Sequence, residues 1–325
     1  MHIDLIDAQA GGDVGRVVTH GFPPIPGATV AEKAHFLREF GDGFRVAMID
    51  EPYGNAEQCI DILVEPSSRA ADAGLIIMGT MGYPNFSGSN AMCAMVALVD
   101  SGQISLTDEG RTVVLETPGG LTRCRLDGHA GSVTSVEYDA LPGFSLSNTI
   151  DVHLPRYGTV EYQLIDGGAP YIVVDADGLG LDPHRTPRAE LTEFFGMLRE
   201  RVASEADLIH PVHGQLPPPT LGLLIGEMHT DDARNPTIDV AVFMDGGVIC
   251  QGPTGTGTTA MLTWLWQRDA VPLGSAVRAL SPTGNSFTGT VTDTTKHQQH
   301  TGVCTRIRGV PAKISTSDVT MSAPF

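Results

Sequence analysis

Two apolar helices, each preceded by a short polar turn, constrain this chain more than any other feature. The first turn is Ser87-Gly88-Ser89-Asn90, and residues 91–99 after it are almost wholly apolar. A second polar turn, residues 253–259, leads into the apolar segment 260–266. A helix that has no polar face is buried in the interior of a protein. The pattern therefore predicts two buried helices.

The N-termini of these two helices are suited to binding an anion. The first N–H groups of a helix have no partner within the helix, and the helix dipole is positive at that end. Small polar residues at the turn can cap the helix and leave other N–H groups available to a ligand. Because the arrangement occurs twice, we expect two half-sites that face one ligand.

The spacing of apolar residues elsewhere predicts many short strands and two more helices. Thr29 followed by Val30, Ala34 and Leu37 predicts a helix over residues 30–40, and a second amphipathic helix is expected over 187–206. We expect strands at residues 3–6, 15–18, 44–49, 60–64, 74–78, 111–116, 122–126, 133–138, 158–165, 171–174, 220–225, 238–243, 286–291 and 304–307. The end of the chain is polar. A glycine-rich stretch at 128–131 predicts a domain boundary.

Composition excludes some classes of partner. A chain of 325 residues with 41% hydrophobic and 18% charged residues is typical of a globular protein of about two domains. The formal net charge of −18 opposes binding to the phosphates of nucleic acid. The chain has no apolar run of about 18 residues, so no transmembrane helix is expected. The first residues lack the pattern of a signal peptide, and we expect a cytoplasmic protein.

The sequence does not predict a metal site. The five cysteines, Cys59, Cys93, Cys124, Cys250 and Cys304, have no paired or metal-like spacing, as is common in a reducing compartment. Cys93 lies inside an apolar helix and is expected in the core. His229 with Asp231 and Asp232 is a weak metal pattern, for which a solvated loop is the favoured interpretation.

Several motifs, taken together in their order and spacing, resemble the proline racemase family. They are residues 7–18, Glu51-Pro52-Tyr53-Gly54, Ala71-Asp72-Ala73-Gly74, Phe86-Ser87-Gly88-Ser89-Asn90, Pro253-Thr254-Gly255-Thr256-Gly257 and Ser286-Phe287-Thr288-Gly289. The likeness covers nearly the whole chain. The turn at Ser87 resembles a subgroup in which Ser-Gly-Ser-Asn replaces the Cys-Gly-His of other members.

The resemblance implies an α/β fold of two pseudo-symmetric domains, of the proline racemase and diaminopimelate epimerase type. Each domain would place strands around a central buried helix, with the site in the cleft between the domains. We expect an N-terminal domain over residues 1–128, completed by the C-terminal segment from about 308 to 325. The second domain would span residues 129–307. The protein is expected to be a monomer or a homodimer.

The resemblance also implies a cofactor-independent reaction at the α-carbon of a cyclic amino acid. The two catalytic positions of the family match Ser87 and Thr254. One residue would act on each face of the carbon, and backbone N–H groups would hold the carboxylate. The matched substrate-binding positions are Gly88, Ser89, Asn90, Cys250, Gly255 and Thr256.

The residues at the two catalytic positions favour one family activity over the others. Neither is a cysteine, and a threonine at the second position resembles trans-3-hydroxy-L-proline dehydratase. That reaction removes the α-proton and releases the 3-hydroxyl, giving pyrroline-2-carboxylate. A 4-hydroxyproline 2-epimerase or a proline racemase is the alternative enzyme, and a non-catalytic binding protein of the family is a third interpretation.

Three departures from the family pattern bear on the chemistry. A serine hydroxyl ionises far less readily than a thiol, so Ser87 needs a partner base or a strong local field. Cys250 stands where the family has an Asp that helps to bind the substrate amine, and Gln9 stands where it has a His. The sequence therefore predicts a remodelled ligand pocket.

Overall fold

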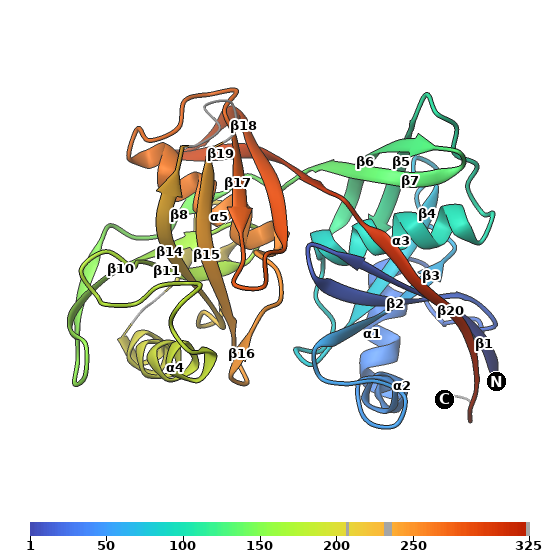
Figure 1. Cartoon of the computed structure of the whole chain (residues 1–325). Helices are drawn as coiled ribbons and strands as arrows, with labels where there is room; N and C mark the ends of the chain where they lie inside the picture. The colour runs from blue at the N-terminus through green and yellow to red at the C-terminus, as the bar shows by residue number, and fades with distance from the viewer. Residues whose placement is uncertain (206–207, 231–235, 323–325) are drawn as a thin grey trace. The chain divides into compact units, whose positions relative to one another are not determined.

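The computed structural model of the chain describes residues 1–205, 208–230 and 236–322 and divides it into two units (Figure 1). Unit 1 comprises Met1–Tyr138 and Arg308–Phe325, and unit 2 comprises Asp139–Ile307. The glycine-rich stretch at 128–131 is not the division. It contains the turn of a hairpin between β6 (Gly120–His129) and β7 (Ser132–Asp139), with positive φ at Ala130 and Gly131.

Unit 1 is built from short helices and strands. Its helices are α1 (Val30–Phe40), α2 (Asp42–Met48) and α3 (Gly88–Asp100). Its strands are β1 (His2–Ala10), β2 (Asp13–His20), β3 (Gln58–Val64), β4 (Ala73–Met78), β5 (Arg111–Thr117), β6, β7 and β20 (Ala312–Thr320).

Unit 2 contains the longest described helix and more described strands than unit 1. Its helices are α4 (Arg188–Glu205) and α5 (Gly255–Gln267). Its strands are β8 (Phe144–Ser145), β9 (Ile150–Leu154), β10 (Gly158–Asp166), β11 (Pro170–Asp175), β12 (Ile209–His210), β13 (Gly214–Gln215), β14 (Leu221–His229), β15 (Thr237–Met244), β16 (Val248–Ile249), β17 (Ala276–Leu280), β18 (Ser286–His297) and most of β19 (His300–Gly309).

The two units repeat one order of strand pairing. In unit 1, β1–β2 is antiparallel, β2–β3 parallel, β3–β4 antiparallel and β4–β5 parallel. In unit 2, β10–β11, β11–β14, β14–β15 and β15–β17 follow the same sequence of directions. Each parallel pair needs a crossover connection, and a helix supplies it every time. This repeat confirms the predicted α/β fold with internal pseudo-symmetry.

In unit 2 the sheet lies between α4 and α5, with apolar clusters on both faces (Figure 1). Successive side chains of a strand point to opposite faces. Accordingly, Ile172 and Val174 of β11 pack with α4, whereas Tyr171 and Val173 pack with α5. A strand that is covered on both faces is apolar throughout, as the segment 171–174 is.

In unit 1, α1 and α2 cover one face of the sheet and α3 covers the other (Figure 1). Ile60 and Ile62 of β3 pack in the cluster around α1 and α2. Every residue of α3 from Gly88 to Leu98 is buried. In α5, all residues from Gly255 to Leu265 except Thr256 are buried. The prediction of two buried helices is confirmed, and Cys93 lies in the core as expected.

One expectation about local structure was wrong. Residues 44–49 were expected to form a strand, but they belong mostly to α2, where Phe44 and Met48 are buried one turn apart. Spacing of four between apolar residues fits a helix, and alternation of two would be needed for a strand. The polar segment near the C-terminus forms β20, which pairs antiparallel with β1.

Some expected segments extend past the described residues. Residue 206, the last of the expected helix over 187–206, lies outside them, and so do residues 323–325. Among the described residues, the structure has no helix that combines the length and the apolar character needed to cross a membrane.

Gly222 of β14 provides a test of the packing in unit 2. A Cβ atom at Gly222 would overlap with the buried Phe195 ring of α4. We predict that Gly222→Ala lowers the free energy of unfolding by about 1–3 kcal/mol, measured by denaturant titration, because overpacking forces the ring to move. Gly196→Ala in α4 is the matched control. A Cβ there meets nothing within 4 Å, so the change should be neutral or stabilising by up to about 1 kcal/mol. Equal effects of the two changes would contradict this packing.

Candidate active site

The first helix start, residues 87–90, presents a serine hydroxyl held by neighbouring side chains. Ser87 has an extended backbone (φ −146°, ψ 126°) and precedes α3, but its side chain does not cap the helix. Asn90 Nδ2 donates to Ser87 Oγ at 2.9 Å, and Ser89 Oγ lies 3.2 Å from Ser87 Oγ. Ser89 and Asn90 are buried, whereas Ser87 is half-buried. The Ser87 hydroxyl is therefore oriented and still partly accessible.

The first helix start also has unused backbone donors. The Ala91 N–H bonds the Ser87 carbonyl at 2.9 Å, as the first bond of the helix. In the part of the chain that the structure describes, the N–H groups of Gly88, Ser89 and Asn90 have no acceptor. Such a group of N–H donors at a helix N-terminus binds anions. Gly88 has no side chain for a steric reason, because a Cβ there would overlap with the Tyr138 hydroxyl.

Behind the first helix start, the sheet presents polar side chains to α3. Gly15 of β2 lies opposite Cys59 of β3. A Cβ at Gly15 would lie 2.7 Å from Asp61 Oδ2, 2.9 Å from Cys93 Cβ and 3.0 Å from Asn90 Oδ1. The absence of a side chain at Gly15 therefore lets α3 approach the sheet closely. It also brings Asp61 and Asn90 to the same small region.

Two carboxyl groups in this layer have unusual pKa values. Loss of hydration raises the pKa of Asp13 of β2 to about 6. Asp61 of β3 is fully buried, and neither of its carboxyl oxygens has a hydrogen-bond partner among the described residues. Burial raises the pKa of Asp61 well above its ordinary value. Asp13 is therefore ionised in most molecules near pH 7, and Asp61 keeps its proton to a higher pH than an exposed carboxyl group does.

The second helix start, residues 254–257, holds its hydroxyl differently. Thr254 has a positive φ of 52°, and its Oγ1 accepts a hydrogen bond from the Gly257 N–H at 2.9 Å. The hydroxyl of the buried Tyr171 lies 3.0 Å from Thr254 Oγ1 and 2.7 Å from Thr256 Oγ1. The N–H groups of Gly255 and Thr256 have no acceptor within the described ranges. This start thus combines a capping hydroxyl, a phenol and two unused donors.

The positions at which the sequence departs from the family pattern have structural contacts of their own. Cys250 directly follows β16, its N–H donates to the Val242 carbonyl at 2.8 Å, and its half-buried side chain packs against the apolar cluster around α5. Gln9 Oε1 accepts from the Gly12 N–H at 3.1 Å and so holds the turn between β1 and β2.

The sequence-predicted residues fall into two groups. Ser87, Gly88, Ser89 and Asn90 lie together in unit 1, and Cys250, Thr254, Gly255 and Thr256 lie in unit 2. Sequence reasoning missed Asp13, Asp61 and Tyr171. A signal for two of them is present in the sequence, because Asp61 interrupts the apolar run 60–64 and Tyr171 carries the one hydroxyl in the strand 171–174.

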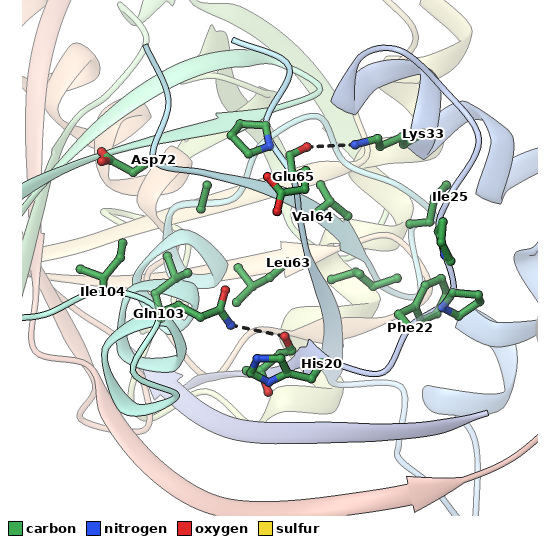
Figure 2. Close-up of a pocket in the computed structure, with 17 residues that line it drawn as sticks. His20, Phe22, Ile25, Lys33, Leu63, Val64, Glu65, Asp72, Gln103 and Ile104 are labelled. Carbon is green, nitrogen blue, oxygen red and sulfur yellow. Dashed lines mark hydrogen bonds between the residues drawn. The ribbon is translucent and has the colours of Figure 1, made fainter. Parts of the chain in front are cut away.

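Other candidate features lie apart from both helix starts. Unit 1 has a cavity of about 580 Å³, lined in part by Phe22, Leu63, Val64 and Ile104, but by none of the predicted site residues (Figure 2). Lys33 at its rim is bound to the Glu65 carbonyl, with an Nζ to O distance of 2.9 Å. His229 Nε2 lies 2.9 Å from Asp239 Oδ2, while Asp231 and Asp232 lie outside the described residues. No group of three or more metal-ligating side chains is placed to hold an ion within the described ranges.

The fold is that of an α/β protein of two units. In each unit a polar turn leads into a buried helix, α3 in unit 1 and α5 in unit 2. Comparison with known proteins gives the family directly: the chain belongs to the proline racemase family, whose model matches residues 5–324. It is 28% identical to a proline racemase of Clostridioides difficile over 94% of this chain and 91% of that protein.

Two other relatives carry different names. The chain is 28% identical to a trans-L-3-hydroxyproline dehydratase of Saccoglossus kowalevskii, over 93% of this chain and 92% of that protein. Its fold matches the crystal structure of a hydroxyproline epimerase from Agrobacterium vitis with bound trans-4-hydroxy-L-proline. That match has a TM-score of 0.86 at 26% identity and covers 98% of this chain and 92% of that chain. The family thus includes racemases, epimerases and a dehydratase.

The buried Asp61 predicts an unusual dependence of stability on pH. Its pKa is higher in the folded state than in the unfolded state, so ionisation favours unfolding and its destabilising effect grows as pH rises above the unfolded value. We predict that Asp61→Asn, which cannot ionise, is more stable than the unchanged protein at pH 8. The expected gain is about 1.4 kcal/mol for each pH unit above the unfolded-state pKa, up to the folded-state pKa of Asp61, because Asn has no proton to retain. The gain should shrink toward pH 4.

Denaturant titrations at pH 4, 6 and 8 would measure this effect. Asp100→Asn is a suitable control, because Asp100 forms a half-exposed ion pair with Lys313 and gains nothing from losing its charge. A pH-independent difference between Asp61→Asn and the unchanged protein would show that Asp61 is ionised in the folded state.

Proposed function

We propose that this protein catalyses the cofactor-independent dehydration of trans-3-hydroxy-L-proline, or of a closely related cyclic amino acid. The α-proton is removed, the 3-hydroxyl leaves, and the enamine product rearranges to pyrroline-2-carboxylate. Family membership and the similarity to a named trans-L-3-hydroxyproline dehydratase support the substrate class. A 4-hydroxyproline 2-epimerase or proline racemase is the alternative, supported by the likeness to an epimerase of known structure.

The observation that carries this proposal is the difference between the two hydroxyls. Ser87 is hydrogen-bonded to Asn90 and adjacent to Ser89, and the Asp13 carboxyl group lies near Ser89. Thr254 is bonded to a phenol and to a backbone N–H, with no carboxylate bonded to it among the described residues. A racemase needs a base on each face of the α-carbon, whereas a dehydratase needs one base and one acid. The pair Ser87 and Thr254 fits the second requirement better.

In the proposed reaction, the unused N–H groups bind the substrate carboxylate. Those of Gly88, Ser89 and Asn90 come from the first helix start, and those of Gly255 and Thr256 from the second. Removal of an α-proton places negative charge on the carboxylate, and fixed N–H donors stabilise that charge. Cys250 is proposed as a wall of the substrate site rather than as a base, because its side chain packs on apolar groups.

The proton transfers balance as follows. The Cα–H bond breaks and its proton passes to Ser87 Oγ as the Ser87 hydroxyl proton leaves to water, while the electron pair enters the new Cα–Cβ double bond. The C–O bond at the 3-position breaks, and the leaving hydroxide takes a proton from the Thr254 hydroxyl to become water. The Tyr171 hydroxyl, 3.0 Å away, can return a proton to Thr254. Proton exchange with water restores both sides after the product leaves.

The proposal predicts a specific result with a panel of proline and hydroxyproline isomers in deuterium oxide. We expect proton NMR to show loss of the ring hydroxyl from trans-3-hydroxy-L-proline. Incorporation of α-deuterium with the hydroxyl retained, and appearance of the other isomer at Cα, would instead identify an epimerase or racemase. Binding of pyrrole-2-carboxylate without turnover of any isomer would identify a binding protein. Ser87→Ala is the matched negative control.

Tyr171→Phe separates the two chemical steps. Loss of the phenol should slow release of the hydroxyl by about 10–100-fold, since general acid catalysis contributes about 10²–10⁴ and Tyr171 acts through Thr254. Exchange of the α-proton with deuterium should change less than threefold, because Ser87 is untouched. Tyr157→Phe, at a tyrosine that packs beside α4, is the control. An equal loss of both steps in Tyr171→Phe would contradict the assignment of Tyr171 to the acid side.

A further inference from the structure

The buried carboxyl group of Asp61 has no part in the reaction as described above. Asp61 interrupts the apolar run of residues 60–64, and its side chain is fully buried in β3. Neither of its carboxyl oxygens has a hydrogen-bond partner among the described residues. A buried polar group without a partner lowers stability, so its presence in a core requires an explanation.

The strand register places Asp61 against the first turns of α3. Ile60 and Ile62 pack in the cluster around α1 and α2, so Asp61 between them faces the other side of the sheet, which α3 covers. Gly15 of the neighbouring strand β2 faces the same side. A Cβ atom at Gly15 would lie 2.7 Å from Asp61 Oδ2 and 3.0 Å from Asn90 Oδ1. The carboxyl group of Asp61 and the amide oxygen of Asn90 therefore border one small space.

The atoms that border this space are hydrogen-bond acceptors without a donor. Asn90 Oδ1 is buried and, like both oxygens of Asp61, has no partner in the part of the chain that the structure describes. An amide oxygen can only accept hydrogen bonds, and the same is true of an ionised carboxyl group. Such oxygens repel each other where little solvent screens them. A proton on Asp61 converts one acceptor into a donor and can satisfy both groups.

Asn90 is also the side chain that orients the proposed base. Asn90 Nδ2 donates to Ser87 Oγ, with a distance of 2.9 Å between the two atoms. An amide carries its oxygen and its nitrogen on opposite sides, so a bond that fixes the oxygen also fixes the nitrogen. An N–H directed at Ser87 Oγ stabilises the negative charge that this oxygen gains as its own proton leaves. The reversed amide would accept the Ser87 proton instead and would favour the neutral hydroxyl.

We propose that Asp61 is a positioning residue for Ser87, and that its protonated carboxyl group donates a hydrogen bond to Asn90 Oδ1. This bond holds the Asn90 amide with Nδ2 directed at Ser87 Oγ. The Ser87 oxygen then keeps an N–H donor while it takes the α-proton of the substrate. Asp61 acts through Asn90 and touches no reacting atom. The inference rests on the function proposed above, in which Ser87 is the base.

Two thiols share this layer with Asp61. Cys93 of α3 already donates to the Ala8 carbonyl, with a distance of 3.4 Å between Sγ and O. Cys59 lies two residues before Asp61 on the same face of β3, where its thiol is a weak donor. A carboxylic acid is the stronger donor of the two, so we assign the hydrogen bond to Asp61. Cys59→Ala tests this assignment directly.

The charged groups on neighbouring strand positions do not pair with Asp61. Asp13 shares a face of β2 with Gly15, and loss of hydration raises the pKa of Asp13 to about 6. Arg16 lies on the opposite face of β2 and pairs with Asp7, at 2.8 Å between Nε and Oδ1. Burial raises the pKa of Asp61 well above its ordinary value, as expected for a carboxyl group that gains no partner in exchange for its hydration.

Two variants of Asp61 separate the role of a donor from that of a charge. Asp61→Asn keeps an N–H donor for Asn90 Oδ1, and kcat for α-proton exchange should stay within about threefold of the unchanged protein. Asp61→Ala removes the donor and should lower kcat by about 10–100-fold, with KM changed less than threefold. Direct loss of a donor to a developing charge costs about 10²–10³ in kcat, and Asp61 acts one residue away.

Two controls accompany these variants. Ile62→Val changes packing on the other face of the same strand, and Cys59→Ala removes the nearby thiol. Both should leave kcat unchanged. Equal losses in Asp61→Asn and Asp61→Ala, or no loss in Asp61→Ala, would overturn the proposal. A loss in Cys59→Ala as large as that in Asp61→Ala would identify the thiol as the donor and would overturn it as well.

A measurement that needs no turnover separates this proposal from the proposed function. In protein labelled with carbon-13 at aspartate carboxyl groups, Asp61 should still be protonated at pH 6, where exposed aspartates are ionised. Asp61→Asn assigns the signal. Asn90→Ala removes the acceptor and should lower the midpoint of the Asp61 titration, because a hydrogen bond to the neutral form is lost. Cys93→Ala, which opens space in the same layer, should lower it less.

The outcomes of the titration are distinct from those of the activity assay. Equal midpoints in Asn90→Ala and Cys93→Ala, or an ionised Asp61 at pH 6, contradict the hydrogen bond, whatever the activity. Absence of α-proton exchange with every isomer, in a protein whose Asp61 titrates as expected, contradicts the proposed function instead.

Discussion

Both helix starts depend on one constraint, the close packing of a fully apolar helix against a sheet. A helix such as α3 has no polar side to turn toward water, so its orientation is fixed by the strands beneath it. Its first N–H groups must nevertheless remain without partners inside the helix. The result is a rigid set of donors at a position that the core determines. A donor set that is rigid before the ligand arrives stabilises developing charge without the cost of reorganisation.

The same packing places polar groups where solvent does not reach. Gly15 allows α3 to lie so close to the sheet that Asp61, Asn90 and Cys93 share one small region. In such surroundings a carboxyl loses hydration that its neighbours do not replace, and its pKa rises. The shift is large for Asp61, which has no hydrogen-bond partner in the described ranges, and smaller for Asp13. A packing requirement thus produces a carboxyl group that titrates near neutral pH.

Much of this arrangement could be predicted from the sequence, because it is local in the chain. The two buried helices, their polar turns and most strands follow from composition and periodicity within windows of about ten residues. The strand expected over residues 44–49 was wrong because apolar residues there are spaced both by two and by four. The segment forms the helix α2, which buries Phe44 and Met48. The C-terminal strand β20 was missed because exposed polar residues carry no periodicity, and its pairing with β1 joins the two ends of the chain.

The residues around the hydroxyls were harder to predict because they come from separate strands. Ser87 to Asn90 are contiguous and could be recognised as a turn, but Asp13 lies on β2 and Asp61 on β3. Only the parallel register of these strands, with Gly15 opposite Cys59, shows that they face the same helix. Tyr171 reaches Thr254 across a sequence separation that no short motif spans. The apolar pattern identifies which face of a strand is buried, but not which helix covers that face.

The difference between the two helix starts follows from this long-range placement rather than from the matched motifs. Both motifs offer a hydroxyl and free N–H groups, so the motifs alone describe two equivalent ends. In unit 1 the sheet beneath the helix contributes a carboxyl group, and in unit 2 it contributes a phenol. At neutral pH a carboxyl near its pKa can take a proton, whereas a tyrosine can only give one. Under the proposed function, the strand residues behind each helix, more than the residue at its start, decide which end removes a proton and which end supplies one.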